Sequence, residues 1–324
     1  MKLTTFSYRN REHLGLFIQD QIFPLHAISN TLPNNMTTFL QGGESMMQAA
    51  QQIEQEIKEG QHQAHAVPVE EATLLAPVPR PNSFRDAYAF RQHVATSRRN
   101  RGLEMIPEFD EFPVFYFSNH LAIAGPGNID CMPKHFEQMD FELEVAVVIN
   151  KQGRNIAAAE ADSYIAGYMI MNDLSARKLQ MEEMKLNLGP AKGKDFATAI
   201  GPWLVTKDEL EPYKTTAAAG HIGDAYQLEM ICLVNGKEVS RGNFADMNWT
   251  FAEVIERISY GVDIYPGDLI GSGTVGTGCF LELNGTGKLN DPNYATQWLE
   301  PGDTVTMKVT GLGTLENTVH LTNN

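Results

Sequence analysis

Two glutamates separated by one residue are the first candidates for chemistry. Glu142 and Glu144 lie in the apolar run Phe141 to Ile149, which predicts a β-strand. Side chains two apart on a strand point to the same face, so these carboxylates are expected to lie close together. Close carboxylates repel one another unless a cation lies between them or one stays protonated. Two interpretations remain open from this pattern alone: a metal site, or a half-exposed strand that shows acids to water.

A third carboxylate, Asp173, follows the apolar run Tyr168 to Met171 and precedes the helical segment Ser175 to Gln180. Strand ends often present functional groups, but aspartate is also a common helix N-cap. On that helix, Arg177 and Gln180 are three residues apart and share a face. They offer guanidinium and amide donors to an anionic oxygen, although a solvated helix surface fits the same spacing.

A segment dense in functional groups, Arg85 to His93, directly follows several prolines. His93 is a candidate general base, because an ordinary histidine titrates near neutral pH. A structural role for a single histidine is the competing interpretation.

The glycine-rich stretch Gly267 to Gly278 formally contains GxGxxG at Gly271, Gly273 and Gly276. A dinucleotide site needs a helix directly after this motif, to hold the pyrophosphate at its N-terminus. The residues from Cys279 to Gly285 predict a strand instead. We therefore reject a nucleotide-binding module and expect a glycine turn that presents Thr274.

These candidates must be positioned by a chain of mostly short strands, which disfavours a doubly wound parallel sheet. The proline cluster from Pro68 to Pro81 predicts a boundary between a small N-terminal domain, residues 1–70, and a main domain, residues 71–324. Further predicted elements are a helix from Ser45 to Lys58, a hairpin turning at Asn235-Gly236, a helix started by the capping box Thr250 to Glu253, and a strand pair from Asp303 to His320.

The composition excludes several classes of protein. The 324 residues include 25 Lys and Arg against 40 Asp and Glu, a formal net charge of −15. This charge argues against nucleic acid and against anionic membrane surfaces. No apolar stretch is long enough to span a membrane, and the N-terminus lacks a signal-peptide pattern. Three widely spaced cysteines predict neither disulfides nor a zinc site, so we expect a cytoplasmic protein.

Taken together, the motifs resemble the fumarylacetoacetate hydrolase family. The matching pieces occur in the family's order from about Leu75 onward: RDAYAFRQH (85–93), PVFYFSN (113–119), DFELEVAVVI (140–149), MNDLSARKLQ (171–180), GPAKGKDF (189–196) and GDLIGSGTVGTGCFLEL (267–283). The resemblance implies an α+β, predominantly β fold, a mixed β-roll preceded by a small N-terminal domain. It also implies a homodimer.

The resemblance assigns roles residue by residue. The metal ligands fall on Asp86, Glu142, Glu144 and Asp173. The catalytic groups fall on His93 as base, Glu282 as the carboxylate that orients it, and Arg177, Gln180 and Lys194 as donors to negative oxygen. The substrate contacts fall on Tyr88, Tyr116, Thr274, Arg177 and Gln180. Four carboxylates without Cys or His suit a hard cation, Mg²⁺ or Ca²⁺, with Mn²⁺ as an alternative.

Within the family, the tyrosine pair and the spacing of Asp86 and His93 look most like bacterial fumarylacetoacetase. The expected reaction is therefore carbon–carbon hydrolysis of a β-diketo acid, fumarylacetoacetate to fumarate and acetoacetate, the last step of tyrosine breakdown. The alternative is another 2-keto-acid enzyme of the family: an acylpyruvate hydrolase, an oxaloacetate decarboxylase, or a keto-deoxy sugar acid dehydratase or isomerase. In the animal enzymes an arginine binds the distal carboxylate of the substrate, and this sequence has no clear counterpart of it. The nearby arginines Arg98, Arg99 and Arg101 do not fall at the matching position. A catalytically silent metal-binding protein is disfavoured by the full set of base and donors.

Overall fold

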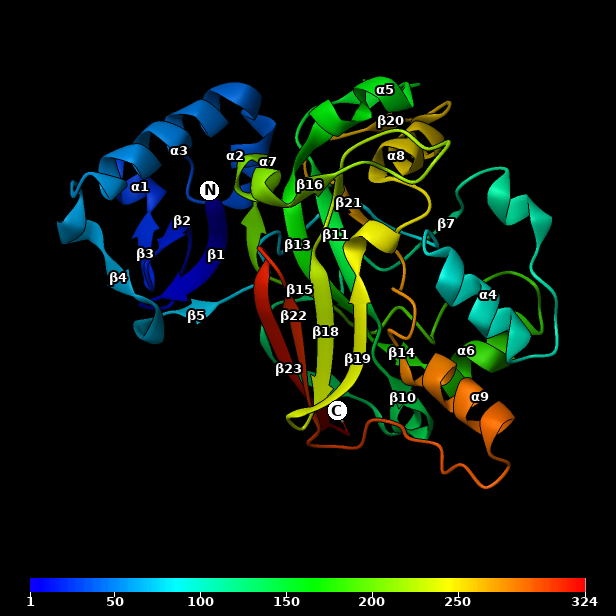
Figure 1. Cartoon of the computed structure of the whole chain (residues 1–324). Coiled ribbons are helices and arrows are strands. Elements are labelled where there is room, and N and C mark those ends of the chain that lie inside the picture. Colours follow the sequence, from blue (N-terminus) through cyan, green and yellow to red (C-terminus); the bar gives the residue numbers. More distant parts are fainter. Residues whose placement is uncertain (324) are drawn as a thin grey trace.

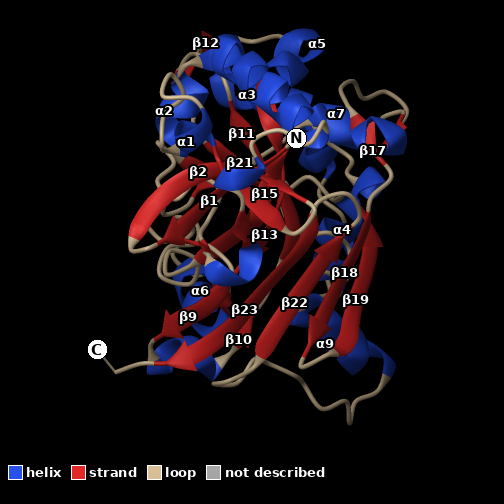
Figure 2. Cartoon of the chain, turned by 90° about the vertical axis from the view of Figure 1, so that its left-hand side faces the viewer, coloured by secondary structure: helices blue, strands red, loops and turns tan. Residues whose placement is uncertain are grey.

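The computed structural model, which describes residues 1–323, is built around two β-sheets (Figures 1 and 2). The larger sheet has twelve strands in the order β4-β3-β2-β1-β15-β13-β11-β21-β6-β7, with β5 paired to β1 and β8 paired to β15. Its strands are β1 (Lys2–Tyr8), β2 (Arg11–Ile18), β3 (Gln21–Pro24), β4 (Val67–Pro68), β5 (Thr73–Leu74), β6 (Phe84–Ala87), β7 (Phe115–Phe117), β8 (Ile123–Ala124), β11 (Leu143–Ile149), β13 (Ile165–Asp173), β15 (Thr198–Val205) and β21 (Leu269–Gly271).

The smaller sheet has five strands in the order β19-β18-β22-β23-β9. They are β9 (Gly127–Cys131), β18 (Glu229–Val234), β19 (Lys237–Asn243), β22 (Thr304–Val309) and β23 (Gly313–Leu321). Three two-stranded pairs complete the described strands: β10 (Met139–Asp140) with β14 (Ser175–Ala176), β12 (Gly153–Arg154) with β20 (Asp263–Ile264), and β16 (Lys214–Thr215) with β17 (Ala225–Tyr226). Antiparallel pairs dominate, and β6–β21, β8–β15 and β9–β23 are parallel, which confirms the expected mixed β-rich fold.

Helices cover the margins of these sheets. Figure 1 shows α4, α6 and α9 gathered on one side of the molecule, away from the first strands. The α-helices are α1 (Leu25–Ile28), α2 (Met36–Gln41), α3 (Gly43–Lys58), α4 (Arg91–Arg99), α5 (Ala158–Ala161), α6 (Arg177–Met184), α7 (Lys207–Leu210), α8 (Phe251–Ser259) and α9 (Phe280–Asn290). None of the described helices is both long and apolar enough to cross a membrane.

Strand β11 is buried on both faces, because it lies between the two hydrophobic cores. Leu143, Val145 and Val147 pack into the core that reaches the smaller sheet, whereas Ala146 and Val148 pack into the core that reaches the N-terminal strands. The half-exposed strand considered from the sequence is therefore wrong. A strand that is buried on both sides has no solvent-exposed face for acidic side chains.

The elements with strong local signals form as predicted. The hairpin between β18 and β19 turns at Asn235 and Gly236 with φ of 50° and 77°, as a type I′ turn requires. Thr250 and Glu253 form the reciprocal bonds of a capping box at the start of α8. The helix predicted from Ser45 is α3, and the C-terminal strand pair is β22 with β23.

One predicted element is wrong. The residues from Cys279 to Gly285, expected as a strand, lie at the start of the eleven-residue helix α9. The alternation of apolar residues there resembles a strand, but the backbone N–H groups of Phe280 and Leu281 donate to the carboxylate of Asp140, at 2.7 and 2.9 Å. A cap contributed from 140 residues away cannot be seen in local sequence.

The N-terminal segment continues the large sheet. Strand β1 pairs antiparallel with β15, with Lys2 opposite Val205 and Leu3 opposite Leu204. In Figure 1 these first strands and α3 form the side of the molecule opposite α4 and α9. The large sheet contains strands from both sides of residue 70. The division into two domains at this residue stays a prediction.

Candidate active site

Four carboxylates predicted as metal ligands meet at one point of the large sheet. Asp86 comes from β6, Glu142 from the residue just before β11, Glu144 from β11, and Asp173 from the end of β13. One carboxylate oxygen from each lies within 4.8 Å of the other three, and all four side chains are buried. Their strands are neighbours through β21, so the sheet order itself gathers residues that are distant in sequence.

Two glycines of the GxGxxG stretch make room for this cluster. Gly271 lies opposite Asp86 across the parallel β21–β6 pair, and a Cβ at this position would lie 2.4 Å from Asp86 Oδ1. Gly273 has φ of 77°, and a Cβ there would lie 2.6 Å from the carbonyl oxygen of Ala87. The backbone N–H of Gly273 donates to Asp86 at 3.1 Å. These two glycines therefore allow the close approach of β6 and the carboxylate of Asp86.

The dinucleotide interpretation fails, but for a different reason from the one the sequence suggested. A helix does follow the motif. Its N-terminus is already occupied by Asp140. The strand that follows this helix, β22, lies in the smaller sheet and not beside β21, so no βαβ unit is formed.

The electrostatics of the cluster favour a cation. Burial, followed by the charge of Asp173, raises the pKa of Asp86 from 3.8 to about 8. Burial and the charge of Asp86 raise the pKa of Glu144 well above its ordinary value. One oxygen of Glu144 is buried without a hydrogen-bond partner. Four hard oxygen donors and an orphaned carboxylate oxygen fit a divalent cation such as Mg²⁺, Ca²⁺ or Mn²⁺.

Two buried cations partly neutralise the cluster. Lys194 Nζ donates to Glu142 and, at 2.6 Å, to Asp173. Arg177 Nη2 donates to Glu142 at 2.7 Å, and its Nη1 donates to the amide oxygen of Gln180 at 3.0 Å. Burial alone would raise the pKa of Glu142, but Lys194 and Arg177 lower it, so this carboxylate stays ionised.

Asp173 belongs to the carboxylate cluster and is not a helix cap. Helix α6 begins at Arg177, and the residue at its N-cap is Ala176. The Asp173 carboxylate instead accepts from Tyr116 Oη at 2.7 Å and from Thr198 Oγ1 at 3.1 Å. The N-cap interpretation is therefore wrong.

A buried histidine–carboxylate pair faces the cluster. His93 on α4 and Glu282 on α9 are joined by a 2.6 Å hydrogen bond between Nδ1 and Oε2. His93 lines the cavity, with Tyr88 edge-on to its ring at 5.7 Å between centroids. When Nδ1 donates to Glu282, the other ring nitrogen carries a lone pair, as a general base requires.

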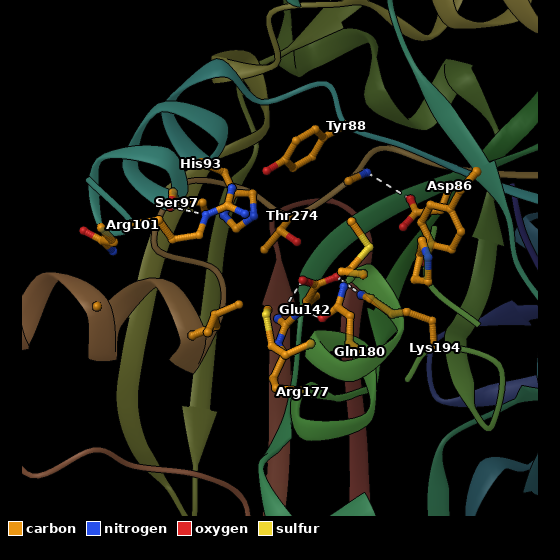
Figure 3. Close-up of a pocket in the computed structure, with 18 of the residues that line it drawn as sticks. Asp86, Tyr88, His93, Ser97, Arg101, Glu142, Arg177, Gln180, Lys194 and Thr274 are labelled. Atoms are coloured by element: carbon orange, nitrogen blue, oxygen red, sulfur yellow. Dashed lines mark hydrogen bonds and ion pairs between the residues drawn. The ribbon is translucent and has the colours of Figure 1, made fainter. Parts of the chain in front are cut away.

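A single cavity of about 660 Å³ connects these groups (Figure 3). Figure 3 shows His93 and Tyr88 on one side, Arg177, Gln180 and Lys194 on the other, and Thr274 between them. Ten of the predicted site residues line it: Asp86, Tyr88, His93, Tyr116, Glu142, Glu144, Arg177, Gln180, Lys194 and Thr274. Asp173 and Glu282 lie directly behind this lining, bonded to Lys194 and His93.

Two structurally important carboxylates were missed in the sequence. Asp140 binds both Arg177 and the start of α9. Glu183, at the end of α6, accepts the backbone N–H groups of Ala191, Lys192 and Gly193, at 2.7 to 3.2 Å, just before Lys194. Asp140 opens the DFELEV motif, but no spacing rule connects it to α9.

Comparison with known proteins shows the family. The model of the fumarylacetoacetate hydrolase C-terminal domain matches residues 82–320, so the chain belongs to this family. The human mitochondrial oxaloacetate tautomerase FAHD2A is 30% identical over 309 residues, which cover 95% of this chain and 87% of that protein. The Bacillus subtilis oxaloacetate tautomerase YisK is 28% identical, over 98% of this chain and all of its own length.

Solved structures share the fold. A HpcE-like protein from Mycobacterium smegmatis superimposes with a TM-score of 0.73 at 23% identity, over the full length of both chains. A Sphingobium maleylpyruvate hydrolase, solved with manganese(II) and pyruvate, gives a TM-score of 0.69 at 20% identity and covers 99% of both chains. The narrower expectation of a bacterial fumarylacetoacetase gains no specific support from the human and Bacillus relatives, both of which are named oxaloacetate tautomerases.

Proposed function

We propose that this chain is a divalent-metal-dependent enzyme that moves a proton on a 2-keto acid and interconverts the keto and enol forms of oxaloacetate. The observation that carries the proposal is the placement of His93 and Glu282 across one cavity from four buried carboxylates. The tautomerase names of relatives at 28–30% identity make oxaloacetate the first substrate to test. Cleavage of fumarylacetoacetate is not favoured.

The chemistry divides between the two sides of the cavity. Asp86, Glu142, Glu144 and Asp173 would hold the cation, which when bound polarises the 2-keto and carboxylate oxygens of a keto acid. The free ring nitrogen of His93 takes the proton from C3 and releases it to water, while the 2-oxygen takes a proton from water; both transfers run backwards in the reverse direction. Glu282 keeps the imidazole in the required tautomer. Gln180 and Lys194 line the same cavity and would donate to the oxygen that gains negative charge.

Carbon–carbon hydrolysis of an acylpyruvate is the second candidate. The cavity continues beyond His93 along α4 and α9, to Ser97, Arg101 and Lys288. This extension leaves room for an acyl group that oxaloacetate lacks. The same base would then take a proton from water rather than from carbon.

The test separates the two reactions by their products. Chelator-treated protein, with Mg²⁺, Mn²⁺ or Ca²⁺ added back, is mixed with enol-oxaloacetate and with acetylpyruvate, and the enol absorbance is followed. Tautomerisation removes the enol without releasing pyruvate from oxaloacetate, whereas hydrolysis of acetylpyruvate yields pyruvate and acetate. We expect metal-dependent tautomerisation. A rate no faster than the uncatalysed one with every metal would refute the proposal.

A further inference from the structure

The side chain of Asp140 is fully buried, and each of its oxygens accepts two hydrogen bonds. Oδ1 accepts from the backbone N–H groups of Phe141 at 3.0 Å and Phe280 at 2.7 Å. Oδ2 accepts from the backbone N–H of Leu281 at 2.9 Å and from Arg177 Nε at 2.8 Å. Asp140 does not line the cavity, so it has no direct access to substrate.

On one side, Asp140 determines where α9 begins. The N-cap residue of α9, Cys279, makes no side-chain cap, and Asp140 takes its place at the first two N–H groups. A carboxylate at a helix N-terminus satisfies free donors and is favoured by the helix dipole. Glu282 is the third residue of this helix, so its carboxylate is placed against His93 by a helix whose start Asp140 fixes.

On the other side, Asp140 orients Arg177. Its bond to Nε fixes the plane of the guanidinium, which leaves Nη2 aimed at Glu142 and Nη1 aimed at Gln180. Because Glu142 is one of the four clustered carboxylates, the orientation of Arg177 also fixes that ligand. A guanidinium released from Asp140 would be less neutralised and would compete with a cation for Glu142.

We propose that Asp140 is a positioning residue that holds the base side of the site, Glu282 and His93, in register with the metal side, Arg177 and Glu142. This inference rests on the proposed function for its kinetic consequences, but the metal-binding consequence stands without it. A buried carboxylate that only capped α9 would need no bond to Arg177.

The first test is Asp140→Asn, which keeps the shape but turns one acceptor into an NH₂ group facing the N–H donors of Arg177 and Leu281. We expect kcat to fall, and the Kd for Mn²⁺ to rise, each by about tenfold to a hundredfold, the usual cost of losing a residue that orients a metal ligand. Titration calorimetry with Mn²⁺ alone measures the second effect, so a failure of the proposed reaction remains distinguishable from a failure of this inference.

The second test is Asp140→Ser, which removes the charge beside Arg177 and leaves a shorter, neutral hydroxyl near the start of α9. Mn²⁺ affinity should fall more than kcat measured at saturating metal. In an Arg177→Gln background the effect of Asp140→Asn on Mn²⁺ affinity should largely disappear, because the two substitutions break one connection.

Thr250→Ala is the matched control, because it removes the side-chain cap of α8, a helix that does not line the cavity. It should lower thermal stability while leaving kcat and Mn²⁺ affinity unchanged. If either Asp140 variant behaves like this control, losing stability but keeping wild-type kcat and Mn²⁺ affinity, Asp140 is only a cap and the inference is overturned. If Asp140→Asn does not fold, the serine variant decides.

Discussion

At the scale of single residues, the proposed base is an imidazole that a buried carboxylate holds by one hydrogen bond. The 2.6 Å bond from His93 to Glu282 joins two side chains that are each less than a tenth exposed. Removing a general base usually costs about 10²- to 10⁴-fold in rate. We therefore expect His93→Gln to lose turnover by that factor while it folds and keeps its affinity for Mn²⁺.

The matched control for this substitution is His62→Gln. His62 also bonds a carboxylate, Glu56, at 2.7 Å, but it lies on the N-terminal side of the molecule, outside the cavity. It should keep wild-type kcat and KM. Near wild-type turnover by His93→Gln would remove His93 from the mechanism.

Only part of the residue-scale picture was visible in the sequence. The spacing of Glu142 and Glu144 placed them on one face, and the structure puts both in the buried cluster. Asp173 was a candidate because it follows a predicted strand, but its role as a ligand, like that of Asp86, came from the family resemblance, because no local rule links residues that far apart. Asp140 was missed because its partners on α9 are 140 and 141 residues away.

At the scale of elements, the loop that carries Lys194 is anchored at its base by Glu183. The Glu183 carboxylate accepts three consecutive backbone N–H groups, from Ala191 to Gly193. Between these anchors the segment exposes Leu186 and Leu188 almost completely, so few apolar contacts hold it. We expect Glu183→Ala to loosen this loop and to lower kcat by about three- to tenfold. The loss of a fully buried carboxylate that accepts hydrogen bonds would lower kcat more, but Glu183 is partly exposed to solvent.

Hydrogen exchange of residues 185–195, measured together with kcat, checks this expectation. Glu182→Ala is the control, because Glu182 carries the same charge on the same helix turn and bonds none of these N–H groups. Unchanged exchange in the Glu183 variant would show that the loop is held by other contacts.

The elements also show which sequence signals are reliable. The capping box of α8 and the Asn-Gly turn of the β18–β19 hairpin are complete within a few residues, and both predictions are confirmed. Helix α9 has glycines in its interior and a cap from another part of the chain, so its local preference is weak. Gly285 has a packing reason, since a Cβ there would lie 2.5 Å from Asn100 at the end of α4. Tertiary contacts therefore determine that Phe280–Asn290 form a helix, and the local sequence does not.

At the scale of the whole molecule, the sheet order is what makes the site, and sequence could not supply it. Strand β11 lies between β13 and β21, and β6 follows β21, so the ligand-bearing strands converge only after long-range pairing. The same sheet extends through β15 to β1 at the beginning of the chain. The N-terminal strands therefore extend the sheet that carries the carboxylate cluster. The predictions of a homodimer and of a cytoplasmic location stay predictions.

The buried cluster also makes the stability of the whole fold depend on pH and metal. Burial and the charge of Asp173 raise the pKa of Asp86 from 3.8 to about 8. Between these values the metal-free fold holds a proton that the unfolded chain has lost, so its stability should fall as the pH rises through this range. A bound cation replaces the proton and removes the repulsion. Metal should therefore stabilise the protein more at about pH 8 than at about pH 6.

Thermal unfolding of chelator-treated and Mn²⁺-loaded protein across this range measures the effect. The gap between the two melting temperatures should widen with pH. Asp86→Asn should reduce the pH dependence of the metal-free protein, because an amide at this position has no proton to lose and no charge to bury, and should leave the part that comes from Glu144. A gap of equal size at both ends of the range would mean that the cluster does not exchange protons for metal, and that Lys194 and Arg177 alone neutralise it.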